Sequence, residues 1–118
     1  MLSGLNIPKT IPLTENEIEM AENTDDDVTS MRLRIEGFVQ AVGYRNYAIE
    51  KARALDLDGW IRNRADGSVE ALVSGSTKSV EAFVTACAQG PAGSKIKSID
   101  LHKAERPEEK GFRRRPSL

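Results

Sequence analysis

Apolar and polar residues alternate in the stretch that begins at Met31. Met31, Leu33 and Ile35 share one face of this stretch, and charged residues occupy the positions between them. A period of two residues is typical of a β-strand with one face buried. Asp66-Gly67 is a strong signal for a hairpin turn between two more such stretches. Strands after the first are predicted at 57–63, 69–75 and 95–102.

Two other stretches repeat apolar residues about once per helical turn, and each predicts an amphipathic helix against a sheet. The second helix begins after the capping candidates Ser76 and Thr77 and ends at Gly90-Pro91. The buried faces are formed by Tyr44, Ala48, Ala52 and Leu55 in the first helix, and by Val80, Phe83, Val84 and Cys87 in the second. The predicted order is β-α-β-β-α-β. This order is typical of an α+β, ferredoxin-like sandwich, with two helices on one face of an antiparallel sheet.

The chain has 118 residues, a length that corresponds to one folded domain. Its charge is distributed unevenly between the N-terminal segment and the rest. Residues 1–30 hold seven acidic residues and one lysine, a net −6, so residues 31–118 carry +5 of the total −1. We expect a flexible acidic arm over 1–30 and a folded domain over 31–118. A basic domain suits anionic ligands, although an excess of this size is also common on an ordinary solvated surface.

The chain has one cysteine and one histidine, which limits its chemistry. Cys87 lies on the apolar face of the second helix, and we expect it to be a core residue. His102 falls on the strand face opposite Leu101, where we expect exposure rather than catalysis. No Cys/His metal cluster is expected. The absence of a signal-like or membrane-spanning stretch favours the cytoplasm and no membrane partner.

The segment "GFVQAVGYR", residues 37–45, connects the first strand to the first helix. Gly37 and Gly43 permit backbone angles that other residues rarely adopt. A turn into a helix N-terminus directs unpaired N–H groups at one spot, which favours an anion. Arg45 opposes the helix dipole there unless an anion lies between them. The alternative is an ordinary surface arginine paired to a carboxylate.

Together with "GWIRNRADGSVEALVSG", this segment resembles the acylphosphatases, a family of small enzymes that hydrolyse the carboxyl-phosphate bond. The resemblance runs from about Met31 to about Leu101 and implies a ferredoxin-like fold, a small acyl phosphate as substrate, and no metal or organic cofactor. It also implies that Arg45 and Asn63 are catalytic. The implied phosphate-binding loop consists of Gln40, Ala41, Val42, Gly43, Tyr44 and Arg45.

Three positions depart from the pattern of that family. Ala41 replaces a glycine of the loop, and its methyl group is unfavourable if the backbone there has a positive φ. Asp56 replaces the glycine of an "LGL" motif, and aspartate tolerates the left-handed conformation better than most residues. Near the C-terminus a "GFxI" pattern becomes Gly111-Phe112 followed by the arginines 113–115. We expect a weakly anchored edge strand there.

The residues around Asn63 have structural interpretations. Arg62 and Arg64 are expected to face solvent, opposite Asn63. Strict alternation places Trp60 on their face, whereas the resemblance favours a packing role, which we prefer. Tyr44 is expected to pack rather than to react.

A non-enzymatic module is the alternative function, because ferredoxin-like domains also bind RNA or small regulatory ligands. Aromatic residues make up only 5% of the chain, few for a sheet that stacks bases. We therefore expect an enzyme with no nucleic acid partner. A monomer is also expected.

Overall fold

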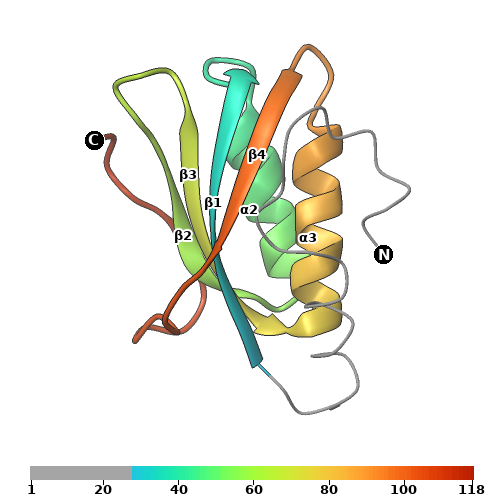
Figure 1. The fold of residues 1–118 in the computed structure, drawn as a ribbon, viewed down its shortest axis with the longest axis vertical. Coiled ribbons are helices and arrows are strands. Elements are labelled where there is room, and N and C mark those ends of the chain that lie inside the picture. The colour runs from blue at the N-terminus through green and yellow to red at the C-terminus, as the bar shows by residue number, and fades with distance from the viewer. Residues whose placement is uncertain (1–27) are drawn as a thin grey trace.

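The computed structural model describes residues 28–118, which form a five-stranded sheet with two helices on one face (Figure 1). The elements in chain order are β1 (Val28–Phe38), α2 (Tyr44–Ala54), β2 (Asp58–Asn63), β3 (Val69–Ser76), α3 (Thr77–Gln89), β4 (Lys95–Lys103) and β5 (Phe112–Arg114). The predicted β-α-β-β-α-β order and ferredoxin-like class are confirmed. Most of the expected acidic arm lies outside the described residues and stays a prediction. Its last three residues, 28–30, belong to β1.

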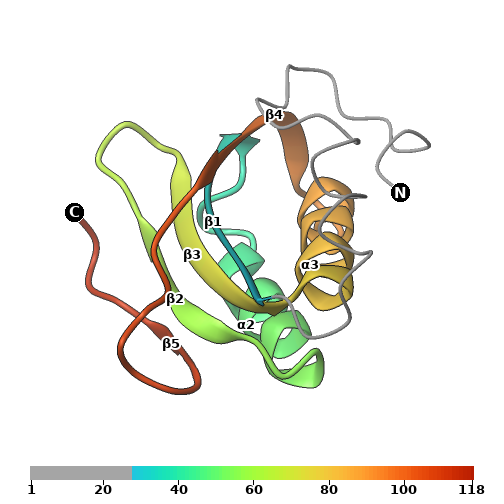
Figure 2. The same cartoon turned by 60° about the horizontal axis from the view of Figure 1, so that its bottom comes forward.

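The strands are arranged in the order β4-β1-β3-β2-β5. The β1, β2, β3 and β4 strands pair antiparallel, as predicted. The arginine-rich C-terminus adds β5, which pairs parallel to β2 and makes the sheet mixed (Figure 2). Phe112 anchors this short strand, because its side chain is buried against Phe83 of α3.

Strand direction determines which loops meet. Both β1 and β2 are antiparallel to β3, so they run in the same direction, and β5 follows β2. The β1–α2 loop, residues 39–43, therefore lies at the same end of the sheet as the β2–β3 hairpin, residues 64–68, and the end of β5 (Figure 1). Arg45 lies just after the loop, in the first turn of α2, and Asn63 lies just before the hairpin, at the end of β2.

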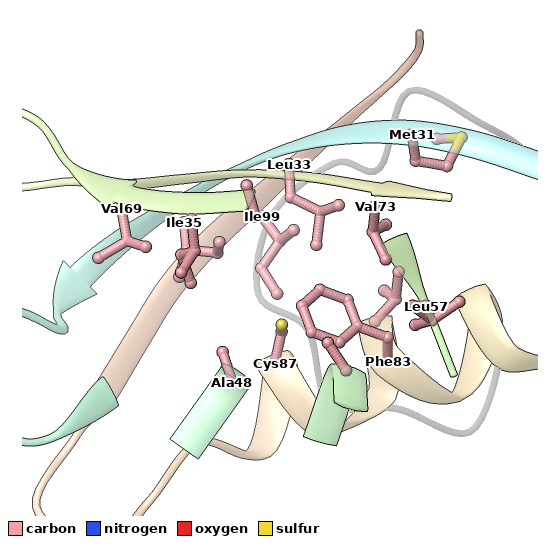
Figure 3. Close-up of a cluster of buried hydrophobic side chains, with 14 of the residues drawn as sticks. Met31, Leu33, Ile35, Ala48, Leu57, Val69, Val73, Phe83, Cys87 and Ile99 are labelled. Carbon is pink, nitrogen blue, oxygen red and sulfur yellow. The ribbon is translucent and has the colours of Figure 1, made fainter. Parts of the chain in front are cut away.

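The core lies between the sheet and the helices. Leu33 of β1 and Ile99 of β4 are fully buried and point toward Phe83 and Cys87 of α3 (Figure 3). The alternation in β1 thus predicted its buried face correctly. Cys87 is a core residue, as expected, and burial raises the pKa of its thiol to about 12. Such a thiol is a poor nucleophile at neutral pH.

Candidate active site

The β1–α2 loop is fastened to the β2–β3 hairpin by one side chain. Gln40 Nε2 donates hydrogen bonds to the carbonyl oxygens of Arg64, at 2.9 Å, and Ser68, at 2.8 Å. The carboxamide of this predicted loop residue thus faces the hairpin. The loop and the end of β2 are held in one fixed arrangement as a result.

Replacing Gln40 with alanine is expected to lower the free energy of unfolding by about 1–3 kcal/mol, because two hydrogen bonds to backbone carbonyls are lost. The loop is then free to shift from the end of β2, so KM for an acyl phosphate should rise severalfold. Chemical denaturation and steady-state kinetics measure the two effects. Gln89→Ala, at the exposed end of α3, is the control. An unchanged KM in Gln40→Ala would mean that this tie does not position the loop.

The N-terminus of α2 is open. Gly43 is the N-cap, with φ 76°, and no side chain caps the helix within the described residues. The first backbone bond runs from Tyr47 N to Gly43 O, at 3.0 Å. The N–H groups of Tyr44, Arg45 and Asn46 precede it and have no partner within the helix. Free N–H groups of this kind favour an anion, and the anion site that the sequence indicates here stays a prediction.

Arg45 is the second residue of α2, and its side chain is half-buried. Loss of solvent is the main cause that lowers the pKa of its guanidinium from the ordinary value, and the positive charge of Arg114 lowers it further. The helix dipole also disfavours a cation at this position. Three effects thus oppose the charge of Arg45, and the attraction of a nearby anion would offset them. An ion pair of Arg45 with a carboxylate, the alternative interpretation, is not found within residues 28–118.

Asn63 is the last residue of β2 and lies on the same face as Ile61, which is fully buried under the helices. Its Oδ1 is buried and accepts no hydrogen bond from the described residues. A buried acceptor without a donor is unfavourable by about 1–3 kcal/mol. A hydrogen bond from a bound water can remove this cost. Arg45 and Asn63 thus occupy the same end and the same face of the sheet.

Two other loop residues serve packing. Tyr44 is 1% exposed, and its hydroxyl donates to the carbonyl oxygen of Cys87 at 2.8 Å. Burial is the main cause that raises the pKa of Tyr44 above its ordinary range, so the phenol stays protonated. Tyr44 packs rather than reacts, as expected. Val42 is partly buried against the core.

Ala41 and Asp56, which replace glycines of the family pattern, both adopt a backbone conformation that favours glycine. Ala41 has φ 64° and Asp56 has φ 58°, both in the left-handed region. They are the two non-glycine residues with positive φ in the part of the chain that the structure describes. Ala41 lies in the loop, whereas Asp56 lies in the connection from α2 to β2, at the opposite end of the sheet.

Replacing Ala41 with glycine is expected to lower KM by a few fold, because the left-handed conformation costs alanine on the order of 1 kcal/mol and the loop relaxes without it. Asp56→Gly relieves the same kind of strain far from the loop, so it should change the melting temperature and leave KM unchanged. Kinetics and thermal denaturation on both variants make the comparison. Equal KM values for Ala41→Gly and the unmodified chain would contradict a strained phosphate loop.

The outer face of the sheet carries the remaining candidates. Arg62 Nε and Arg64 Nη1 donate to the same Glu70 oxygen, at 2.8 and 3.0 Å. Burial alone would raise the pKa of Glu70, but these hydrogen bonds outweigh it and hold the pKa below its ordinary value. The two arginines are thus paired and partly covered rather than simply solvated. His102 is exposed, as expected.

Trp60 follows strand alternation, and the preferred packing role against the core is wrong. Its ring lies on the outer face, with the guanidinium carbons of Arg62 and Arg115 at 4.9 and 4.7 Å from its centroid. The strand is regular at this position, so the side chain cannot turn toward the helices.

One pair of residues near the start of α2 was not predicted from the sequence. Arg114 of β5 donates a hydrogen bond from Nη2 to Asn46 Oδ1 in the first turn of α2. This brings a second guanidinium beside Arg45. The run of arginines at 113–115 was the available signal, but it indicated only a charged edge.

Neither a metal centre nor a membrane span is found among residues 28–118. No group of three or more His, Cys, Asp or Glu side chains could hold a metal ion there. In the same range, no helix has the length and apolar character required to cross a bilayer.

The fold defines a small α+β protein in which a loop leads into a helix without a side-chain cap. A model of the acylphosphatase family matches residues 31–114. An acylphosphatase of Rhodospirillum rubrum is 43% identical over 89 residues, which cover 75% of this chain and 98% of the relative. The chain belongs to the acylphosphatase family.

Solved structures agree with this assignment. The crystal structure of the acylphosphatase from Bacillus subtilis superimposes with a TM-score of 0.69 at 32% identity, covering 74% of this chain and 97% of that one. Full-length HypF in a phosphate- and nucleotide-bound form gives a TM-score of 0.73 at 29% identity. That match covers 78% of this chain but 12% of HypF, so this chain resembles one segment of HypF.

Proposed function

We propose that the chain hydrolyses the carboxyl-phosphate bond of small acyl phosphates, with Arg45 and Asn63 as its catalytic residues. Family membership and relatives named acylphosphatase over nearly their whole length support the activity. The observation that carries the residue roles is the uncapped start of α2, where Arg45 has no carboxylate partner within residues 28–118 and Asn63 presents an unpaired buried oxygen at the same end.

The phosphoryl group binds in the loop. Backbone N–H groups of residues 40–45 donate to its nonbridging oxygens, and the dipole of α2 adds partial positive charge. The guanidinium of Arg45 donates two parallel hydrogen bonds to these oxygens. Because the donors are fixed before the substrate arrives, they stabilise the charge of the transition state without reorganising.

The carboxamide of Asn63 orients the attacking water. Its oxygen accepts a hydrogen bond from the water, which then lies in line with phosphorus and the leaving carboxylate. The bond from phosphorus to the carboxyl oxygen breaks as the water oxygen adds. The carboxylate leaves with the bonding electron pair, and the water's proton passes to a phosphate oxygen. No protein acid or base, metal or organic cofactor enters this scheme.

The alternative, an RNA-binding module, is not favoured. Such modules stack bases on aromatic residues of the open sheet face. Trp60 is on that face here, but two guanidinium groups already cover its ring. The expectations of a monomer and of a cytoplasmic location are part of this proposal and await their own measurements.

Loss of benzoyl phosphate absorbance at neutral pH, followed with a chelator present, tests the proposed activity. We expect hydrolysis at the same rate with and without the chelator, and competitive inhibition by inorganic phosphate. Binding of a single-stranded RNA oligonucleotide is measured in parallel. Salt-sensitive RNA binding without turnover would contradict the proposal.

A further inference from the structure

The end of β5 is fixed beside the end of β2. Arg114 pairs with Ile61 in the parallel ladder. The chain then continues along β2, because Arg115 N donates to Ile61 O at 2.8 Å and Leu118 N donates to Asn63 O at 3.0 Å. The backbone that carries Arg114 is therefore held next to the strand that carries Asn63.

The side chain of Arg114 lies on the helix side of the sheet. Phe112, two residues earlier, is buried on that side. Arg113 faces the other way and pairs with Glu109 at 3.1 Å. The hydrogen bond from Arg114 Nη2 to Asn46 Oδ1 then holds its guanidinium at the first turn of α2, one residue from Arg45.

Two positive charges are thus held together where the helix dipole is also positive. Burial is the main cause that lowers the pKa of Arg45, and the positive charge of Arg114 lowers it further, as expected for two neighbouring cations. Neither guanidinium forms an ion pair with a carboxylate of residues 28–118. This arrangement is unfavourable when empty, and a doubly charged anion compensates both cations at once.

We propose that Arg114 is a second phosphate-binding arginine of the site, which contacts the phosphoryl group of the substrate together with Arg45. The proposal rests on the proposed function for the identity of the substrate. Asn46 is then a positioning residue, because it aims Arg114 and does not itself touch the phosphate. Arg114 stands where the family pattern "GFxI" has isoleucine, so this cation distinguishes the chain from that pattern.

The test compares Arg114→Gln with Arg113→Gln in the full 118-residue chain. Glutamine at 114 keeps a polar N–H donor and removes the charge. Arg113→Gln removes the same charge from the opposite face of the same strand. The probe is inorganic phosphate, with its Kd measured by titration calorimetry, and KM and kcat are measured on benzoyl phosphate.

We expect Arg114→Gln to raise both the Kd for phosphate and KM about tenfold, as for the loss of one charge-assisted contact. The value of kcat should stay within about twofold, because a contact made equally to substrate and transition state affects binding alone. Arg114→Lys should recover part of the loss, and Arg113→Gln should behave as the unmodified chain.

An unchanged Kd in Arg114→Gln, or an equal loss in Arg113→Gln, would overturn the proposal. A fall in kcat with an unchanged Kd would overturn it too, because Arg114 would then contribute nothing to the binding of phosphate. If Arg114→Gln does not fold, Arg114→Ile restores the family residue and gives the same comparison. Calorimetry needs no turnover. If the unmodified chain binds phosphate more tightly than Arg114→Gln but does not hydrolyse benzoyl phosphate, the proposed function is contradicted and the inference about Arg114 is supported.

Discussion

Arg45→Gln is expected to lower kcat/KM for benzoyl phosphate by at least about a hundredfold, which corresponds to about 3 kcal/mol of lost transition-state stabilisation. The guanidinium supplies charge and two aligned donors, and glutamine replaces neither. The same variant should be as stable as the unmodified chain or more stable by a few tenths of a kcal/mol, because it removes a cation that opposes the helix dipole.

Lys78→Gln is the matched control for this prediction. Lys78 is the second residue of α3 and is exposed, and it thus has the same helix position as Arg45 in α2. Both variants should show the same small change in stability, measured by thermal denaturation. Only Arg45→Gln should lose activity. An unchanged kcat/KM in Arg45→Gln would show that Arg45 has no catalytic role.

Asn63→Ala is expected to lower kcat about a hundredfold with little change in KM, because it removes the group that orients water and leaves the phosphate contacts in place. The free energy of unfolding should change little, because the lost Oδ1 has no hydrogen bond from the described residues to lose. Kinetics with increasing benzoyl phosphate separates kcat from KM.

Asn63→Asp sharpens this test. The carboxylate keeps an acceptor for water at nearly the same position but adds a negative charge beside the phosphate. We expect KM to rise as well as kcat to fall, since the charge repels the substrate. A variant Asn63→Ala that keeps the unmodified kcat would show that another group holds the water.

The local pattern of apolar, capping and turn residues predicted most of the fold, because residues at the ends of each helix and strand mark where it begins or stops. Ser76 begins α3 as its N-cap, and its side chain accepts from Ser79 N at 3.2 Å. Gly67 turns the β2–β3 hairpin with φ 92°. The resemblance added what pattern alone lacks, since it singled out Ala41 and Asp56 as residues at glycine positions, and both have the left-handed backbone.

The contacts that the sequence did not predict join distant segments. Arg114 meets Asn46 only because β5 pairs parallel to β2 in one register, across 68 residues of chain. Gln40 reaches the carbonyls of the hairpin for a similar reason, because β1 and β2 end together. No local period encodes such a register. For Trp60, strand alternation was the better guide than the packing role we preferred.

We propose that phosphate binds at the start of α2, where Arg45 contacts it and Asn63 orients a water toward it. A crystal structure of the chain grown with inorganic phosphate tests this most directly. We expect phosphate oxygens about 2.7–3.1 Å from the N–H groups of the loop and from the Arg45 guanidinium, with the Asn63 carboxamide directed at the same ion. Phosphate bound instead on the outer face of the sheet, with residues 45 and 63 directed away from each other, would contradict it.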